Sequence, residues 1–241
     1  MASKETNLEV KKNKSWQLFD KIYKRYDLIN DILSVGIITY WRRILVKVIP
    51  EKNNLKLLDC ATGTGQVIFS VMKQHHNAVD QYVGIDLSKN MMTIAKEKKE
   101  KLLYKHKIDF NIADAQQIPF EDNSFDCITM AFGIRNVTDY KVCLKELYRV
   151  LKPGGKALIM EFSLPKNKVI KAIYLLYFRK VLPFVGGFLS GDLSAYRYLN
   201  TTVESFPYGS RFKDSMTQMG FKASYRPLTF GIATLYQGFK V

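Results

Sequence analysis

Two acids and two glycines in the first half of the chain have the spacing of a nucleoside-binding site. Asp59 comes shortly before Gly63 and Gly65, and Asp86 follows about 20 residues later. Glycines permit a tight turn and let the backbone approach a ligand closely. An acid at the end of a second strand can accept hydrogen bonds from ribose hydroxyls. The pattern therefore predicts a nucleoside held against the edge of a parallel sheet.

The type of nucleoside follows from the residues around this turn. Ile68 stands where the dinucleotide fingerprint G-x-G-x-x-G requires its third glycine. A pyrophosphate also favours a site without a carboxylate close by, whereas Asp59 lies just before the turn. An acid there suits the amino group and sulfonium of S-adenosylmethionine. The sequence favours that ligand over a nicotinamide dinucleotide, and a strand-to-helix turn without a ligand is the other alternative.

Alternating apolar segments predict the elements that position the turn. Residues 55–61 suit a buried strand, and 66–75 have helical spacing. Strands that alternate with helices predict an α/β fold with a doubly wound, mostly parallel sheet, whose ligands bind outside the carboxyl ends of the strands. The last two strands have no helix between them, which predicts an antiparallel hairpin. Further strands are expected at 81–86, 108–113, 125–132, 156–162, 221–225 and 234–240, and further helices at 88–103 and 137–151.

The ends and the interruptions of this pattern predict the domain organisation. Residues 1–14 are expected to be a disordered tail, and 15–241 a single domain with a helical cap at 15–50 and an insert at 164–214. Within the insert, 169–189 is strongly apolar, with basic residues interspersed. Pro183 and the following glycines exclude one continuous helix. We expect core packing, or a lid that covers an apolar substrate and touches a membrane surface.

Composition limits the remaining possibilities. The formal net charge of +15 predicts attraction to polyanions, either nucleic acid or an anionic membrane surface, unless the basic surface is simply solvated. The three cysteines are scattered, which indicates a reducing compartment, and the histidines lack metal-ligand spacing, so no metal site is expected. No apolar run approaches the ~20 residues that span a bilayer, and no signal peptide is apparent.

Motifs spread over residues 16–241 carry a family resemblance. The general ones are Leu58–Gly65, Val83–Ser88, Asp114-Ala115, Phe125-Asp126 and Leu151–Gly155. The specific ones are Phe19-Asp20, Tyr26–Asp31, Ser34–Ile37, Trp41–Arg43, Phe125–Val137, Tyr196–Leu199, Phe206-Pro207 and Leu228–Ile232. The first set resembles the class I S-adenosylmethionine-dependent methyltransferases. The second set is similar to the quinone-ring C-methyltransferases of menaquinone and ubiquinone biosynthesis.

The resemblance implies a Rossmann-like methyltransferase fold with N-terminal helices and a helical insert on the substrate side before the last two strands. It implies methylation of a prenylated quinol ring with S-adenosyl-L-methionine as cofactor. The expected acceptor is demethylmenaquinol, in the last step of menaquinone biosynthesis. The alternative is the 2-polyprenyl-6-methoxy-1,4-benzoquinol of the ubiquinone pathway.

The resemblance and the strand ends also imply the site residues. Arg135 follows the fourth strand and stays protonated, so we expect it to stabilise the acceptor phenolate, with a structural salt bridge as the alternative. Tyr196 and Asp192 are further catalytic candidates, through hydrogen bonds to the acceptor. Asp86 is expected to bind the ribose hydroxyls and Asp114 the adenine amino group. The expected cofactor contacts are Asp59, Gly63, Thr64, Gly65, Asp86, Asp114, Ala115 and Ala131.

Four positions depart from the family pattern. Gln66 ends the glycine turn, where the family usually has aspartate, and Ile38 stands where a histidine is frequent. Ser194 replaces a frequent aspartate, and Ala131 replaces a small polar residue or glycine. These changes affect expected contacts to cofactor or substrate and leave the core motifs intact.

Other functions remain as alternatives at this point. An RNA methyltransferase would fit the charge, but the Asn/Asp-Pro-Pro-aromatic element of base amino-group methylation is missing after the fourth strand. We therefore expect no nucleic-acid partner. A non-catalytic subunit with the same fold is less consistent with the intact acids and glycines. The expected partners are the prenylated quinol, a transient anionic membrane surface and a second copy in a homodimer, with a cytoplasmic, peripherally membrane-associated location.

Overall fold

A seven-stranded sheet forms the centre of the described part of the chain, in the order β3-β2-β1-β4-β5-β7-β6. The computed structural model describes residues 16–17, 20, 23, 26–75, 77–184 and 193–241, so the predicted tail lies outside it. The first five strands pair in parallel, and β7 pairs antiparallel with both β5 and β6. The strands are β1 Leu55–Cys60, β2 Val79–Asp86, β3 Ile108–Ile112, β4 Phe125–Ala131, β5 Leu151–Phe162, β6 Phe221–Leu228 and β7 Ala233–Lys240.

Helices cover both faces of this sheet. Apolar side chains of α4, α5 and α6 join the core on one face, and those of α7 and α11 the core on the other. Leu57 of β1 belongs to the first core and Leu58 to the second. Because β1 is buried on both faces, its sequence is mostly apolar instead of alternating. These helices are α4 Ile37–Val46, α5 Gln66–His75, α6 Lys89–Lys99, α7 Tyr140–Val150 and α11 Ser210–Gln218.

The sheet confirms the predicted α/β class, and its strand order places the binding edge. The chain runs from β1 outward to β3 and then crosses to β4 on the other side of β1. In open α/β sheets such a switch point leaves a crevice outside the carboxyl ends of the two strands. The predicted terminal hairpin is confirmed, because β6 and β7 pair antiparallel along their whole length.

Several element boundaries differ from the sequence expectations, and one helix was not expected. Helix α7 begins at Tyr140 because the carboxylate of Asp139 accepts hydrogen bonds from the first free backbone N–H groups, as a strong N-cap does. Strand β5 begins at Leu151, before the predicted start at residue 156. Helix α11 was not predicted, because only Phe212, Ser215 and Met216 of its nine residues are buried and its apolar pattern is short.

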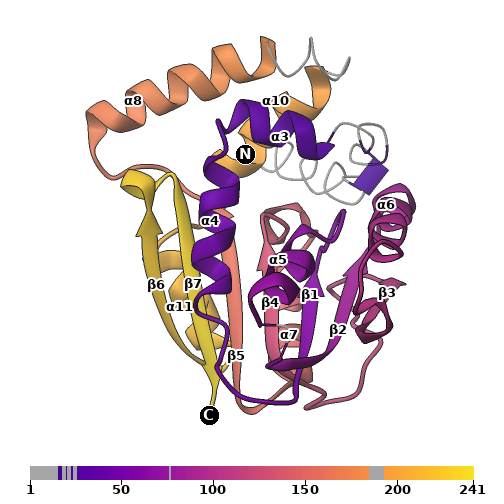
Figure 1. Ribbon diagram of the computed structural model, residues 1–241. Coiled ribbons are helices and arrows are strands. Elements are labelled where there is room, and N and C mark those ends of the chain that lie inside the picture. Colours follow the sequence, from indigo (N-terminus) through magenta and orange to yellow (C-terminus); the bar gives the residue numbers. More distant parts are fainter. Residues whose placement is uncertain (1–15, 18–19, 21–22, 24–25, 76, 185–192) are drawn as a thin grey trace.

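A helical cap lies over the carboxyl ends of the strands (Figure 1). It consists of α3 Tyr26–Leu33, from the predicted N-terminal cap, and of α8 Lys168–Leu176 and α10 Leu193–Ser205, from the predicted insert. Helix α8 continues as a π-helical turn, Tyr177–Val181. The hydroxyl of Tyr177 donates a hydrogen bond to the backbone carbonyl of Leu33, 2.6 Å away. This bond joins the predicted insert to the N-terminal helices.

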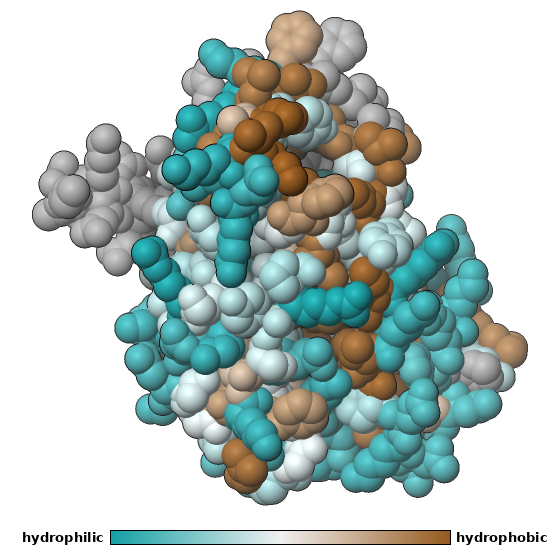
Figure 2. Space-filling view, turned by 90° about the vertical axis from the view of Figure 1, so that its left-hand side faces the viewer, coloured by the Kyte–Doolittle hydropathy of each residue, from teal (hydrophilic) through white to brown (hydrophobic). Residues whose placement is uncertain are grey.

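Apolar side chains gather at the cap end of the face that Figure 2 shows. They lie toward the top of the molecule, where Figure 1 places the cap, and continue downward as a narrow band among mostly hydrophilic side chains. Helix α8 contributes several exposed large apolar residues, among them Val169, Ile173 and Leu176. In the described ranges, no helix has both the length and the hydropathy needed to cross a membrane.

Candidate active site

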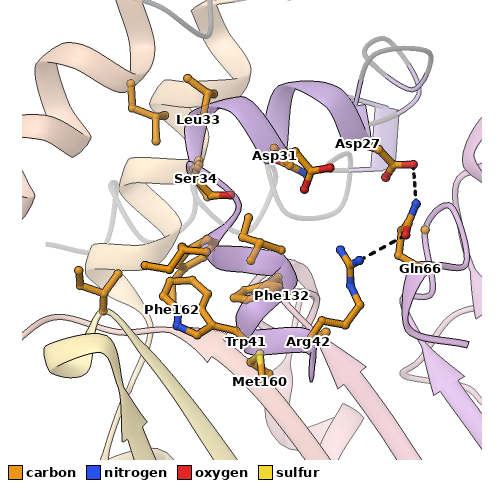
Figure 3. A pocket seen from close by; sticks show the side chains of 18 of the residues that line it. Asp27, Asp31, Leu33, Ser34, Trp41, Arg42, Gln66, Phe132, Met160 and Phe162 are labelled. Carbon is orange, nitrogen blue, oxygen red and sulfur yellow. Dashed lines mark hydrogen bonds between the residues drawn. The ribbon is translucent and has the colours of Figure 1, made fainter. Parts of the chain in front are cut away.

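A cavity of about 470 Å³ lies between the helical cap and the carboxyl ends of the strands. The glycine turn after β1 lines one part of it through residues 61–64, and Phe132 and Arg135 after β4 line another. Figure 3 shows side chains of α3, α4 and the sheet converging on this space. One cavity thus borders both strand ends at the switch point, where a donor and an acceptor could meet.

The glycine turn has the backbone conformation that its sequence predicts. Gly63 and Gly65 have φ angles of 54° and 80°, which favour glycine. A Cβ on Gly65 would come within 2.8 Å of the ring of Phe69, so this glycine permits close packing. A Cβ on Gly63 would meet no atom within 4 Å, which leaves its backbone open to a ligand. The turn therefore fits the close backbone approach expected of a nucleoside site.

Asp86 ends β2 next to this turn, as the spacing predicts. Its carboxylate accepts hydrogen bonds of 2.8 Å from the backbone N–H groups of Gly63 and Ser88. Burial raises the pKa of Asp86, and these two bonds oppose the rise. The carboxylate is thereby fixed at the junction of β2 and the glycine turn, and its contact with a ribose stays a prediction.

Asp59 lies beneath the turn and is almost fully buried. Its two oxygens accept hydrogen bonds from the hydroxyls of Thr62, at 2.6 Å, and Thr129, at 2.7 Å. Burial raises the pKa of Asp59 to about 7, and those hydroxyls oppose the rise. Asp59 therefore stabilises the turn from below, and a direct contact with a cationic ligand end stays a prediction.

The remaining predicted cofactor residues lie at or just after the ends of three strands. Asp114 follows β3 and accepts a hydrogen bond from the backbone N–H of Gln116 at 2.8 Å, and Ala115 is buried in the core of that face. Thr64 and Ala131, the last residue of β4, both line the cavity. The contacts of these residues with the cofactor stay predictions.

Helix α3 contributes an acid, Asp27, that was not predicted as a site residue from the sequence. Asp27 of α3 accepts hydrogen bonds from the Thr64 hydroxyl, at 2.8 Å, and from Nε2 of Gln66, at 3.0 Å. It also forms an ion pair with Lys98. Burial raises the pKa of Asp27, but the bonds from Lys98, Thr64 and Gln66 outweigh it and leave the pKa lowered. Asp27 thus fastens α3 to the glycine turn.

Gln66, one of the departures from the family pattern, has a local role in this arrangement. Its amide donates to Asp27 and its carbonyl oxygen accepts a hydrogen bond from Nη1 of Arg42, at 3.3 Å, as Figure 3 shows. An aspartate at this position would place a second carboxylate beside Asp27. The Gln66 amide instead links Asp27 of α3 to Arg42 of α4.

Arg135 lies in a short 3₁₀ turn after β4 and is 5% exposed. Its Nη1 donates hydrogen bonds to the fully buried carboxylate of Glu161, at 2.7 Å, and to the backbone carbonyl of Phe132. Its guanidinium lies 5.3 Å from the centre of the Phe162 ring. The salt-bridge alternative is therefore present, and the same side chain also lines the cavity.

Glu161, the partner of Arg135, was not predicted as a site residue from the sequence. A single acid near the end of the apolar strand β5 was the available signal, because a buried carboxylate needs a partner. Tyr196 lies in α10 and Asp192 lies outside the described residues, so their catalytic roles stay predictions. In the described residues, no cluster of three or more His, Cys, Asp or Glu side chains could hold a metal ion.

Comparison with known proteins gives the same family over most of the chain. Residues 7–240 match the model of the ubiE/COQ5 methyltransferase family. The chain is 46% identical to the ubiquinone/menaquinone biosynthesis C-methyltransferase UbiE of Geotalea daltonii, over 97% of this chain and 99% of that protein. It is 42% identical to the demethylmenaquinone methyltransferase of Thermus thermophilus, over 92% of this chain and 99% of that protein.

Solved structures with lower sequence identity share the fold. An S-adenosylmethionine-dependent methyltransferase of Thermotoga maritima, described as a possible histamine N-methyltransferase, has a TM-score of 0.64 at 18% identity, covering 94% of this chain and all of that one. Phosphoethanolamine N-methyltransferase 2 of Haemonchus contortus, solved with S-adenosyl-L-methionine, has a TM-score of 0.59 at 19% identity, covering 82% of this chain and 51% of that one.

Proposed function

The chain belongs to the ubiE/COQ5 methyltransferase family, and we propose that it methylates a ring carbon of a prenylated quinol with S-adenosylmethionine as the methyl donor. The acceptor that we favour is demethylmenaquinol, after which several similar proteins are named. The benzoquinol of ubiquinone biosynthesis is the alternative, since other relatives are named for both quinones. The names of these relatives give no support to the RNA methyltransferase considered from charge.

The observation that carries this proposal is the shared cavity. The open backbone of Gly63 and the guanidinium of Arg135 border the same space, although they follow different strands. S-adenosylmethionine supplies, when bound, a methyl group on a positively charged sulfur. The residues that would hold it are Asp59, Gly63, Thr64, Gly65, Asp86, Asp114, Ala115 and Ala131.

The acceptor part of the cavity is mainly apolar and aromatic. Phe132 and Phe162 pack with ring centres 4.7 Å apart, and Trp41 lies about 6 Å from each. Such a surface suits a flat quinol ring, and the neighbouring apolar residues suit the beginning of a prenyl chain. Enclosure beside the donor holds the two reacting partners in place, which can supply on the order of 7–11 kcal/mol of a bimolecular barrier.

Arg135 provides the charge that ring methylation requires. A ring carbon becomes nucleophilic when the neighbouring hydroxyl loses its proton, and the resulting oxyanion needs a fixed positive partner. The positively charged guanidinium stabilises the anion, and the proton of the hydroxyl leaves to water. Glu161 fixes the direction of the guanidinium and balances its charge in the buried wall.

A membrane surface is the other partner that we propose, because a prenylated quinol is held in a bilayer. Helix α8 has two functional faces. Tyr174 lines the cavity, as does Tyr177 in the π-helical turn that follows, whereas Val169, Ile173 and Leu176 are each about two-thirds exposed. Interspersed lysines and the net charge of +15 suit an anionic leaflet. The predicted homodimer and the cytoplasmic location stay predictions.

The direct test is methylation by the purified protein. A short-chain demethylmenaquinol, kept reduced, is incubated with S-adenosylmethionine that carries a labelled methyl group, and the labelled product is identified by mass spectrometry. A benzoquinol of the same chain length and a bulk RNA are tested in parallel. We expect label in the naphthoquinol ring and none in RNA, whereas label in RNA alone would contradict the proposal. Accumulation of a demethyl precursor in a deletion strain gives an independent test.

A further inference from the structure

Ser34, Arg135 and Tyr174 each place on the cavity wall a buried polar atom that has no hydrogen-bond partner among the described residues. These atoms are Oγ of Ser34, Nε of Arg135 and Oη of Tyr174. Buried polar atoms in native proteins are nearly always paired, so each exception requires an explanation. The three residues come from distant parts of the chain and converge on one cavity. A polar ligand entering that cavity is the partner that would satisfy them.

Tyr174 belongs to an aromatic surface that leads to Arg135. Its ring stacks on that of Phe178, with centres 5.1 Å apart and an angle of 24° between the planes. Phe178 lies 6.5 Å from Phe162, and Phe162 is the ring over which the Arg135 guanidinium lies. The Tyr174 hydroxyl and the guanidinium are thus two polar points on one apolar wall, as the recognition of a ring with polar substituents requires.

Ser34 is held close to this wall by a neighbouring contact. Tyr177, one turn beyond Tyr174 on the same side of the helical segment, donates its hydrogen bond to the carbonyl of Leu33. Leu33 directly precedes Ser34 in the connection between α3 and α4. This bond fixes the segment that carries Tyr174 against the connection that carries Ser34. Ser34 and Tyr174 thus line one cavity from two segments that this bond holds together.

We propose that the hydroxyls of Tyr174 and Ser34 bind the ring oxygens of the acceptor and thereby orient the ring carbon toward the methyl donor. The inference rests on the proposed function and extends it to the recognition of the ring. Burial raises the pKa of Tyr174, so its hydroxyl keeps its proton and acts as a donor. A quinol ring has two oxygens, and each has more than one lone pair. Tyr174 and Ser34 can therefore each donate to one of them, while Arg135 stabilises the oxygen that is ionised.

The test measures acceptor binding and turnover in matched variants. The chain has two tryptophans, and Trp41 lines the cavity. In a Trp16→Phe background Trp41 is the only tryptophan, so its fluorescence can report quinol binding. Tyr174→Phe and Ser34→Ala each remove one hydroxyl and little else. Tyr104→Phe removes a hydroxyl from a partly exposed tyrosine outside the cavity lining and serves as the control. The ligands are a short-chain prenylated naphthoquinol and two analogues, each lacking one of the two ring oxygens.

We expect Tyr174→Phe to weaken binding of the naphthoquinol about 10-fold, and Ser34→Ala somewhat less, with unchanged affinity for S-adenosylmethionine. Each loss should vanish with the analogue that lacks the contacted oxygen, and Tyr104→Phe should match the parent. Equal losses with all three ligands, or no loss in either variant, would overturn the inference. The proposed function would still stand in that case if the parent protein methylates the quinol. If the parent neither binds nor methylates any quinol, both fail.

Discussion

Nη1 of Arg135 donates a hydrogen bond to Oε1 of Glu161 across 2.7 Å, in a wall where both side chains are almost completely buried. The same guanidinium donates to the carbonyl of Phe132 and lies over the ring of Phe162. Its direction is therefore fixed before an acceptor enters. A charge that is already oriented costs no reorganisation when an oxyanion forms, which makes it effective in catalysis.

The burial of this ion pair also limits how it can be altered. Removing one member of a buried pair leaves the other charge uncompensated, which typically costs 3–5 kcal/mol of stability. Variants of Arg135 must therefore be checked for folding by a property that does not involve the acceptor. Binding of the methyl donor at the glycine turn provides such a check, since that turn is held by Asp59 and Asp86.

We predict that Asp59 makes the free energy of unfolding depend on pH. Its pKa is about 7 in the folded protein against 3.8 ordinarily, so the folded state binds this proton more tightly. The contribution of Asp59 to stability should therefore fall as pH rises from about 4 to about 7, by at most about 4 kcal/mol. Denaturant unfolding of the wild type and of Asp59→Asn across this range measures the difference. A difference that is constant with pH would contradict the prediction.

Asp86→Ala should weaken the binding of S-adenosylmethionine by about 1.5–3 kcal/mol, the value of a hydrogen bond to a charged group. The substitution removes the expected ribose contact and the acceptor of the Gly63 N–H group. Isothermal calorimetry measures the affinity. Asp80→Ala is the control, because Asp80 lies at the other end of the same strand and is exposed. Equal affinities for the wild type and Asp86→Ala would exclude the ribose role.

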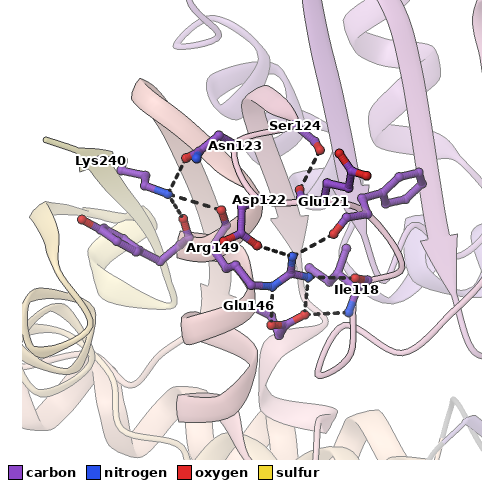
Figure 4. A network of polar contacts seen from close by, with 10 residues as sticks. Ile118, Glu121, Asp122, Asn123, Ser124, Glu146, Arg149 and Lys240 are labelled. Carbon is purple, nitrogen blue, oxygen red and sulfur yellow. Dashed lines mark hydrogen bonds and ion pairs between the residues drawn. The ribbon is translucent and has the colours of Figure 1, made fainter.

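Arg149→Ala should destabilise the fold without affecting the site. Figure 4 shows its guanidinium between the loop that precedes β4 and helix α7, where it binds Glu146, Asp122 and the carbonyl of Ile118. Because this side chain is 30% exposed, we expect a loss of about 1–2 kcal/mol. Arg179→Ala, at an exposed ion pair with Glu204, should cause a much smaller loss. Thermal and urea unfolding test this, and a change in donor affinity would contradict it.

The double substitution Ile173→Glu and Leu176→Glu should abolish binding to anionic vesicles. Both side chains are exposed on the outer face of α8, so the change adds two negative charges without altering the cavity lining. Flotation with anionic vesicles at low salt measures the bound fraction. Leu103→Glu, at an apolar residue that is 84% exposed elsewhere, should retain binding. Equal flotation of both variants would show that α8 is not the membrane-binding face.

Local sequence patterns predicted the parts of the structure that local interactions determine. The glycine turn between Gly63 and Gly65 and the terminal hairpin depend on residues close in sequence, and the structure has both. The start of α7 was misjudged by three residues because the N-cap Asp139 was not recognised. Each of these features has a signal within a few residues.

Contacts between distant segments could not be predicted in the same way. Glu161 lies 26 residues from Arg135, and Asp27 lies 37 residues from Thr64. No periodicity or spacing connects either pair, because the fold alone brings them together. The unpartnered hydroxyl of Tyr174 likewise acquires its significance only from the cavity that it lines. Contacts within the glycine turn can therefore be predicted from local motifs, whereas contacts between distant segments require the structure.

The central claim is that Arg135 stabilises the ionised quinol during methyl transfer. The most direct test compares wild type and Arg135→Ala in single-turnover transfer from saturating S-adenosylmethionine to a short-chain demethylmenaquinol, with donor affinity measured on the same preparations. We predict a rate at least about 100-fold lower for the variant and a donor affinity within about 2-fold of the wild type. A normal rate at saturation combined with lost donor binding would contradict the account and make Arg135 a cofactor residue.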